Sequence, residues 1–457
     1  MSRLPLLPLA LMCLGILLLD HLQAQAPAPA AGAPRNWTTI EGRQFQATLV
    51  KVQDAQVTLR MPTGQMATIA MARLSAADQT FLKSSLAATP TAPPASANPP
   101  PVAPPPVSTV AVTGVTPPRV PPEKRTWPAK VEVDTRAIEV TLAKESAADQ
   151  EYVYRSEAFE FIAQDKLAGS VMKEIARTFE ATRALVQALP WGIDPKPPAD
   201  IGYHRAKFYV NRQQYVADGA PANTGGVYFS KDRIFRVPFE SLGLEMRGKT
   251  WFKNENFKND TIIHEITHQM MHDFLPFIPT WVAEGTAEYT ELLPYNAGRF
   301  LAGSHERGIK EYLKDAQAAG IKPPDIGPVI THLSMTNEDW HSRANNGPRE
   351  QRRLYFASCL LVYYFSHLDG DGKGTRFLKY LDKMAEARDA WGEFFKNPKV
   401  QVNADGSFRY RSDVSLPAQK RNGEYGIEQL SILLDGRDAA QLQKDLADGF
   451  KKIGVRW

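Results

Sequence analysis

The chain contains only two cysteines, Cys13 and Cys359, among its 457 residues. Cys13 lies in a segment that we expect to be removed, so the mature chain cannot form an intramolecular disulfide. The chain also lacks a strong excess of one charge, since 54 Lys and Arg residues face 50 Asp and Glu residues and the net charge is only +4. Nucleic-acid-binding domains concentrate Lys and Arg on one face, so this weak excess predicts no nucleic-acid partner. Hydrophobic residues make up 43% of the chain and charged residues 23%, which is near the average for a soluble globular protein. This composition excludes a wholly disordered, collagen-like or multi-span membrane chain.

The apolar run from Leu4 to Leu19 is too short to span a bilayer, which takes about 20 apolar residues. It follows Arg3 and is typical of the apolar core of a secretory signal. We therefore predict a signal peptide over residues 1–24, a secreted or periplasmic protein, and no membrane span after cleavage. The alternatives are an uncleaved anchor and lipidation at Cys13.

Proline is abundant, and 13 prolines fall between positions 87 and 123. This stretch has hardly any large apolar side chains, so it cannot bury a core and is expected to form an extended spacer. It divides the chain into a small module, residues 36–86, and a large module, residues 125–457.

The small module has the pattern of a small β structure. Residues alternate between apolar and polar over 44–52 and 56–61, and Ser75 with Asp78 forms a helix-capping pattern. Residues 37–50 and 74–79 resemble the small SH3-like β-barrel domain of secreted planctomycete and verrucomicrobial proteins. That resemblance implies an interaction role, with an envelope ligand as the partner. A passive spacer is the alternative.

The spacing of apolar residues in the large module changes along the chain. Residues 131–142 alternate like a strand, and 158–189 have helical periodicity. Residues 225–230 and 233–237 flank a turn and predict a β-hairpin. After Asp260 the pattern is mainly helical. We therefore predict an α+β fold with strands first and helices afterwards.

The chemistry of the large module is expected at His264-Glu265-Ile266-Thr267-His268. Asn259 or Asp260 is a good N-cap for the helix that carries this motif. His264 and His268 are one turn apart, so both imidazoles can bind one tetrahedral Zn²⁺. Glu265 is rotated by about 100° from His264, so it can reach a metal-bound water as a general base.

A third zinc ligand is predicted on the following helix. Pro276 and Pro279 end the first helix, and a second begins near Trp281. If it folds back, Glu284 can reach the metal, and Glu288 can accept the other ring N–H of a ligand histidine. A solvent-exposed face carrying both glutamates is the alternative.

Residues 264–268 followed by 281–289 resemble the gluzincin zinc metallopeptidases, whose distant members include thermolysin and aminopeptidase N. The nearest likeness is to poorly characterised secreted bacterial families, over roughly residues 225–381. The resemblance implies a thermolysin-like catalytic domain with an N-terminal mixed sheet and a C-terminal helical part. It assigns zinc binding to His264, His268 and Glu284, and the role of general base to Glu265.

The resemblance also implies a donor for the developing oxyanion and an edge strand that binds the substrate. Tyr355 matches the position of the donor best. The histidines that could replace it are His332, His341 and His367. The candidate substrate strand contains Gly225, Gly226, Val227 and Tyr228.

The sequence therefore predicts a secreted zinc-dependent peptidase that hydrolyses a peptide or protein substrate with a metal-activated water. One alternative is a catalytically weak binding or scaffold protein at the cell envelope that retains the metallopeptidase fold. Another is a zinc amidase that acts on cell-wall peptides. Asp369-Gly370-Asp371-Gly372 resembles the start of a calcium loop, but Lys373 and Tyr380 occupy positions that need oxygen ligands. A glycine-rich turn is expected there.

Overall fold

The computed structural model describes residues 34–39, 44–53, 56–61, 66–75, 78–79, 82, 119–254, 256–403 and 407–456. The chain forms two compact units that divide between Thr113 and Gly114. The predicted signal peptide, most of the predicted linker and the predicted cleavage site lie outside the described residues.

The first unit contains a four-stranded antiparallel sheet in the order β1-β2-β3-β4. The strands are β1 (Pro34–Thr38), β2 (Gln44–Gln53), β3 (Gln56–Arg60) and β4 (Met66–Ala70), followed by the 3₁₀ helix η1 (Met71–Arg73). Trp37, Leu59 and Leu74 are among the buried residues of its core. The predicted capping contact is present, because the Asp78 N–H donates to Ser75 Oγ at 3.2 Å.

The second unit is built on a six-stranded mixed sheet in the order β10-β11-β9-β8-β7-β6. The strands are β6 (Thr141–Ser146), β7 (Glu151–Arg155), β8 (Phe159–Ala163), β9 (His204–Tyr209), β10 (Val227–Phe229) and β11 (Ile234–Pro238). Strand β9 is parallel to both of its neighbours, and the other pairs are antiparallel. The predicted hairpin is confirmed as β10 and β11, and β10 forms an edge of the sheet.

Shorter strands and 3₁₀ helices complete the β part. They are β5 (Val131–Glu132), β12 (Leu244–Arg247), β13 (Thr250–Lys253), β14 (Tyr295–Asn296), β15 (Arg299–Phe300), β16 (Val400–Val402), β17 (Phe408–Tyr410), η2 (Pro122–Lys124), η3 (Phe239–Leu242), η4 (Ala302–Ser304) and η5 (Pro323–Ile326).

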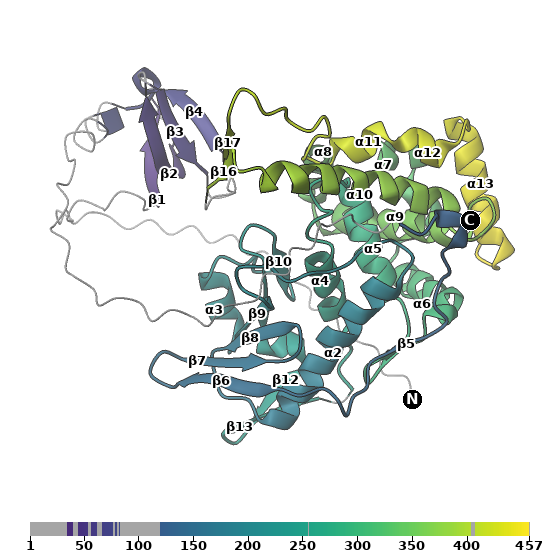
Figure 1. Ribbon diagram of the computed structural model, residues 1–457, viewed down its shortest axis with the longest axis horizontal. Coiled ribbons are helices and arrows are strands. Elements are labelled where there is room, and N and C mark those ends of the chain that lie inside the picture. The colour runs from purple at the N-terminus through teal and green to yellow at the C-terminus, as the bar shows by residue number, and fades with distance from the viewer. Residues whose placement is uncertain are drawn as a thin grey trace. The chain divides into compact units, whose positions relative to one another are not determined.

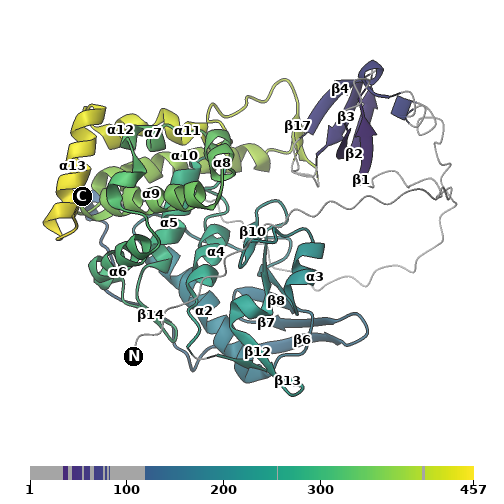
Figure 2. The ribbon, with the colours of Figure 1, turned by 180° about the vertical axis from the view of Figure 1, so that it is seen from behind.

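The helices follow as predicted, mostly after Asp260. They are α2 (Gly169–Ala188), α3 (Arg212–Ala217), α4 (Asp260–Met270), α5 (Thr280–Glu291), α6 (His305–Ala318), α7 (Val329–Leu333), α8 (Asn337–Ala344), α9 (Pro348–His367), α10 (Thr375–Lys396), α11 (Glu424–Glu428), α12 (Leu430–Leu434) and α13 (Ala439–Lys452). Figures 1 and 2 show the sheet and α2 in one half of this unit and α9, α10 and α13 in the other, with α4 and α5 between them. In the part of the chain that the structure describes, no helix is long and apolar enough to cross a membrane.

Two expectations from the sequence were wrong in extent. The helix predicted over 158–189 begins only at Gly169, because Phe159 and Phe161 alternate inward on β8 and pack against Phe179. The strand predicted over 131–142 is interrupted, since only its two ends belong to β5 and β6. Both segments carry enough apolar residues to mimic a longer element.

The described residues before β5 are bound to α10. Arg119 forms an ion pair with Asp389, and Arg125 pairs with Asp382 at 2.8 Å. The last residues of the predicted spacer, from Arg119 onward, therefore contact the second unit.

Candidate metal centre

Helices α4 and α5 together carry the candidate metal centre. The α4 helix begins at Asp260 and buries Ile263 and Ile266. Asn259 stands at the N-cap position, but its side chain makes no capping hydrogen bond and accepts one from Lys253 at 3.2 Å. The α5 helix begins directly after Pro279. A hydrogen bond of 2.7 Å between the buried Thr267 and Thr290 hydroxyls joins the two helices. This contact brings their polar faces together.

The side chains of His264, His268 and Glu284 converge across this contact. The two imidazole Nε2 atoms are 3.1 Å apart, and each lies 3.3 Å from Oε2 of Glu284. The three side chains are 8%, 13% and 14% exposed, so solvent has little access to them. The structure thus brings together the three residues that the sequence predicts as ligands.

The separations of the three ligand atoms fit a tetrahedral metal. Nitrogen and oxygen ligands at 2.0–2.1 Å from a tetrahedral zinc lie about 3.3 Å from one another. The observed 3.1–3.3 Å matches this value without any movement of a side chain. His264, His268 and Glu284 therefore form a buried group that could hold a metal ion.

The electrostatics of the group favour a cation. Burial alone would raise the pKa of Glu284, but the charge and hydrogen bonds of His268 and His264 outweigh it and hold that pKa well below its usual range. Burial would lower the pKa of His264, yet hydrogen bonds to Glu284 and Glu291 raise it. The carboxylates thus require a positive charge between them, which a proton or a metal ion can supply.

The second nitrogen of His264 is held by a residue that the sequence analysis did not name. Nδ1 of His264 lies 3.0 Å from Oε2 of Glu291 and 3.8 Å from Oε1 of Glu288. Glu291 is therefore the better acceptor for the ring N–H. These residues could form a second cation group with His264. When Nε2 binds a metal ion in the first group, however, Nδ1 carries the ring proton and donates it to Glu291.

Glu265 lies on α4 beside the ligand histidines and faces the edge of the sheet. Its Oε2 accepts a hydrogen bond of 2.8 Å from the backbone N–H of Tyr228 on β10. Burial raises the pKa of Glu265, and the charges of His268 and His264 oppose that rise. A carboxylate with a raised pKa is suited to take up a proton near neutral pH.

The two glycines just before β10 lie close to other elements, Gly225 to α4 and Gly226 to β11. A Cβ on Gly225 would lie 3.1 Å from Thr261, and one on Gly226 would lie 2.7 Å from the Phe235 ring. On the other edge of β10, the Tyr228 N–H points away from β11. In an antiparallel pair the C=O of the same residue points the same way. The outer edge of the predicted substrate strand therefore faces α4, with its Tyr228 N–H already bound by Glu265.

Tyr355 lies beside the metal-ligand residues on α9. Its ring centre is 6.1 Å from that of His264, and the Glu284 carboxylate is among the charges that act on its hydroxyl. Burial, followed by the charges of Glu284 and Glu265, raises the pKa of Tyr355, so the phenol stays protonated. A Cβ on Gly285 would lie 2.3 Å from the Ser358 carbonyl oxygen, so this glycine lets α5 pack tightly on α9.

The other histidines have different partners. Nε2 of His332 donates to the Ile326 carbonyl at 2.7 Å, and His367 is bound by the Tyr289 hydroxyl at 2.8 Å. His341 stacks edge-on against Trp340, which in turn contacts Tyr355. Of the three alternatives to Tyr355, His341 is thus joined to it through one shared aromatic neighbour.

The glycine-rich loop between α9 and α10 has its acidic groups already engaged. Asp369 forms ion pairs with Arg376 at 3.1 Å and Arg437 at 2.8 Å. Asp371 accepts hydrogen bonds from the Lys373 N–H and the Thr375 hydroxyl. The expected turn is confirmed.

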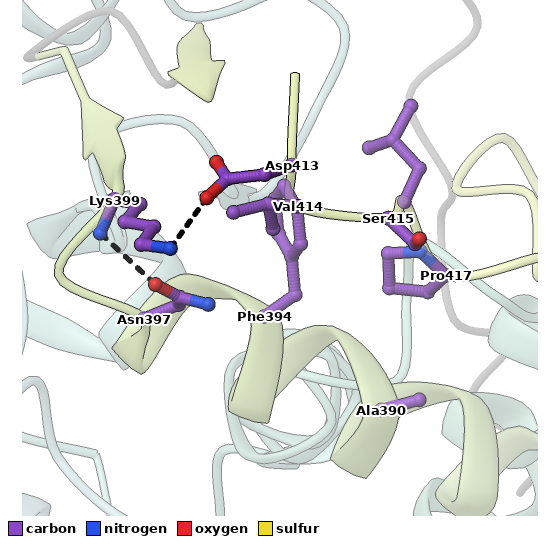
Figure 3. Close-up of a pocket in the computed structure, with 9 residues that line it drawn as sticks. Ala390, Phe394, Asn397, Lys399, Asp413, Val414, Ser415 and Pro417 are labelled. Atoms are coloured by element: carbon purple, nitrogen blue, oxygen red, sulfur yellow. Dashed lines mark hydrogen bonds and ion pairs between the residues drawn. The ribbon is translucent and has the colours of Figure 1, made fainter. Parts of the chain in front are cut away.

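A pocket of about 400 Å³ lies between the end of α10 and residues 413–417. Figure 3 shows Phe394, Val414 and Pro417 at its wall, with Lys399 paired to Asp413. None of its lining residues belongs to the metal-binding group, and its ionic side chains neutralise each other.

Comparison with known proteins adds no family to this description. The chain matches no protein-family profile. No curated protein matches it significantly.

Proposed function

We propose that the protein is a secreted zinc-dependent peptidase of the gluzincin type. The observation that carries this proposal is the triangle of His264 Nε2, His268 Nε2 and Glu284 Oε2 with edges of 3.1–3.3 Å. Two imidazoles and one carboxylate are the donor set of a catalytic zinc with one position left for water or substrate.

Each remaining residue of the site has a role in peptide hydrolysis. When bound, zinc lowers the pKa of water and polarises a carbonyl oxygen. Glu265 takes the proton of the attacking water and later delivers it to the leaving amine. The Tyr355 hydroxyl donates a hydrogen bond to the oxygen that gains negative charge. The carbonyl of Tyr228 on β10 accepts a hydrogen bond from the extended substrate at the edge of the sheet.

The finer architecture belongs to the same proposal. A mixed sheet whose edge strand adjoins the motif helix, followed by a mainly helical half, supports a thermolysin-like catalytic domain. The four-stranded sheet around Trp37 supports an SH3-like domain that binds an envelope ligand. The apolar N-terminal run of the sequence supports export.

The test is Glu265→Gln in the full chain loaded with zinc. Gln can still accept the Tyr228 N–H through its amide oxygen, so the helix and strand stay joined. The loss of basicity should lower turnover of a peptide library by about 10²–10⁴-fold while zinc content stays near one ion per chain. Glu311→Gln, on the exposed face of α6, is the matched control and should be neutral. Near-wild-type turnover by Glu265→Gln would contradict the proposal.

A further inference from the structure

Arg421 is an exposed arginine on the segment between β17 and α11. Its guanidinium lies over the rings of Trp391 and Phe395, 5.1 and 5.0 Å from their centres. Within the described ranges, no carboxylate forms an ion pair with it. Stacking uses the faces of a guanidinium and leaves its N–H edge available for two parallel hydrogen bonds to a carboxylate.

The backbone around Arg421 is held on both sides. The Trp391 indole N–H donates to the Gln419 carbonyl at 2.7 Å, which fixes the segment to α10. The Gly423 N–H donates to the Pro276 carbonyl at 3.0 Å, which fixes it to the loop after α4. The guanidinium thus lies on a segment whose backbone is fixed at two points, so little conformational entropy is lost when it binds an anion.

Arg421 lies on the side of the proposed peptidase site where α4 ends. The Gly423 N–H is bonded to Pro276 after that helix, and Arg388, three residues before Trp391 on α10, lies over the Phe274 ring. His272 lies two residues after Met270, the last residue of α4, and its Nδ1 is 2.9 Å from the hydroxyl of Tyr228 on β10. Burial, followed by the charges of Arg233 and Arg421, lowers the pKa of His272 to about 4. A peptide that runs along β10 past His272 would therefore approach the segment that carries Arg421.

The neighbouring cations already have carboxylate partners. Arg233 pairs with Asp273 at 2.8 Å and Lys420 with Glu424 at 2.8 Å, while Arg388 shares Asp389 with Arg119. Among the cations described around this segment, Arg421 is thus the one whose charge no carboxylate offsets.

We propose that Arg421 is a specificity-determining residue that binds a carboxylate of the peptide substrate. This inference rests on the proposed peptidase function and adds the substrate class, peptides with an acidic group at a set distance from the cleaved bond. The carboxylate is either an Asp or Glu side chain or the C-terminus of the peptide, and both sources offer the same planar acceptor.

The test compares Arg421→Gln and Arg421→Glu with wild type on matched peptides. Each position on both sides of the cleaved bond carries Glu, Gln or Lys in turn, and every peptide is made with a free and an amidated C-terminus. For wild type we expect Glu over Gln at one position, or free acid over amide, by about fivefold in kcat/KM. Arg421→Gln should abolish that preference, and Arg421→Glu should shift it toward Lys, which a merely structural role would not do. Arg136→Gln, an equal loss of charge on an exposed turn, should keep it.

The outcomes separate this inference from the proposed function. A wild-type enzyme that cleaves peptides without any carboxylate preference, or an unchanged preference in Arg421→Gln, overturns the role of Arg421 alone. If no peptide is cleaved, the binding of the same peptides is measured by fluorescence anisotropy, and this measurement tests the role of Arg421. A Glu-over-Gln or acid-over-amide difference in binding that disappears in Arg421→Gln upholds the carboxylate site, and no such difference overturns it.

Discussion

The backbone N–H of Tyr228 donates a hydrogen bond of 2.8 Å to Oε2 of Glu265. This contact joins the edge strand of the sheet to the helix that carries two candidate metal ligands. It engages one oxygen of the carboxylate, and in the proposed mechanism the other oxygen takes the proton of the attacking water. The length of the Glu265 side chain therefore has to span from α4 to both β10 and the reacting atoms.

Shortening this side chain should separate the two contacts. In Glu265→Asp the carboxylate is one methylene shorter, so it cannot hold the Tyr228 N–H and reach the water together. A displacement of about 1 Å can cost about 10²-fold in rate. We expect a loss of that size in kcat with full zinc content, measured by turnover and by elemental analysis. Wild-type kcat in Glu265→Asp would show that the distance between strand and base is unimportant.

Zinc occupancy should depend on His268 and not on His272. His268→Ala removes one corner of the ligand triangle, whereas His272 is bonded to the Tyr228 hydroxyl. We expect about one zinc per chain in wild type and in His272→Ala, and little zinc in His268→Ala after dialysis. Full occupancy in His268→Ala would exclude the assigned ligand set.

Glu291 should matter more for metal affinity than Glu288. Its Oε2 lies 3.0 Å from His264 Nδ1, whereas Oε1 of Glu288 lies 3.8 Å from the same atom. Loss of an acceptor that orients a ligand histidine weakens metal binding by about 10–100-fold. Competition with a chelator should show this loss in Glu291→Gln and a smaller one in Glu288→Gln. The reverse order would return the orienting role to Glu288.

The metal group could be predicted from the sequence because its geometry is local. Four residues of helix fix His264 against His268, and the prolines before α5 allow the chain to turn back with Glu284. Glu291 was missed, although it lies seven residues after Glu284 and thus on the same helical face. Its partner is Nδ1 of His264, the ring nitrogen that points away from Glu284. Only the observed crossing of α4 and α5 shows whether Glu288 or Glu291 lies closer to that atom.

Long-range packing explains the features that the sequence did not indicate. Residues 158–168 share an apolar pattern with the following helix, but the parallel neighbour β9 draws 159–163 into the sheet. The role of Gly285 also depends on a distant element. A Cβ added at this glycine would lie closest to the Ser358 carbonyl oxygen of α9, which no local pattern in the sequence indicates.

Gly285→Ala should therefore disturb both stability and the site. The added methyl group would lie 2.3 Å from a backbone oxygen of α9, so the helices must separate. Such overpacking costs about 1–3 kcal/mol in free energy of unfolding. Gly392→Ala in α10, where a Cβ meets no atom within 4 Å, is the matched control and should stabilise by up to about 1 kcal/mol. Urea denaturation measures both, and equal stabilities would refute the tight contact.

Tyr355→Phe distinguishes two roles of the phenol. The Glu284 carboxylate acts on this hydroxyl, so the phenol could hold a metal ligand in place, or it could donate to the oxygen that gains charge during hydrolysis. Loss of one oxyanion donor costs about 10²–10³-fold in kcat without changing zinc affinity. Loss of a ligand-orienting contact instead weakens zinc binding by about 10–100-fold.

We expect the first pattern, because burial and the nearby carboxylates keep Tyr355 protonated and able to donate. Turnover at saturating zinc and chelator competition on the same Tyr355→Phe sample separate the two roles. His332→Gln is the matched control, since that histidine is bound to the Ile326 carbonyl away from the ligand residues. If Tyr355→Phe changes neither kcat nor zinc affinity, the donor has to be sought at His341, which shares Trp340 as a neighbour with Tyr355.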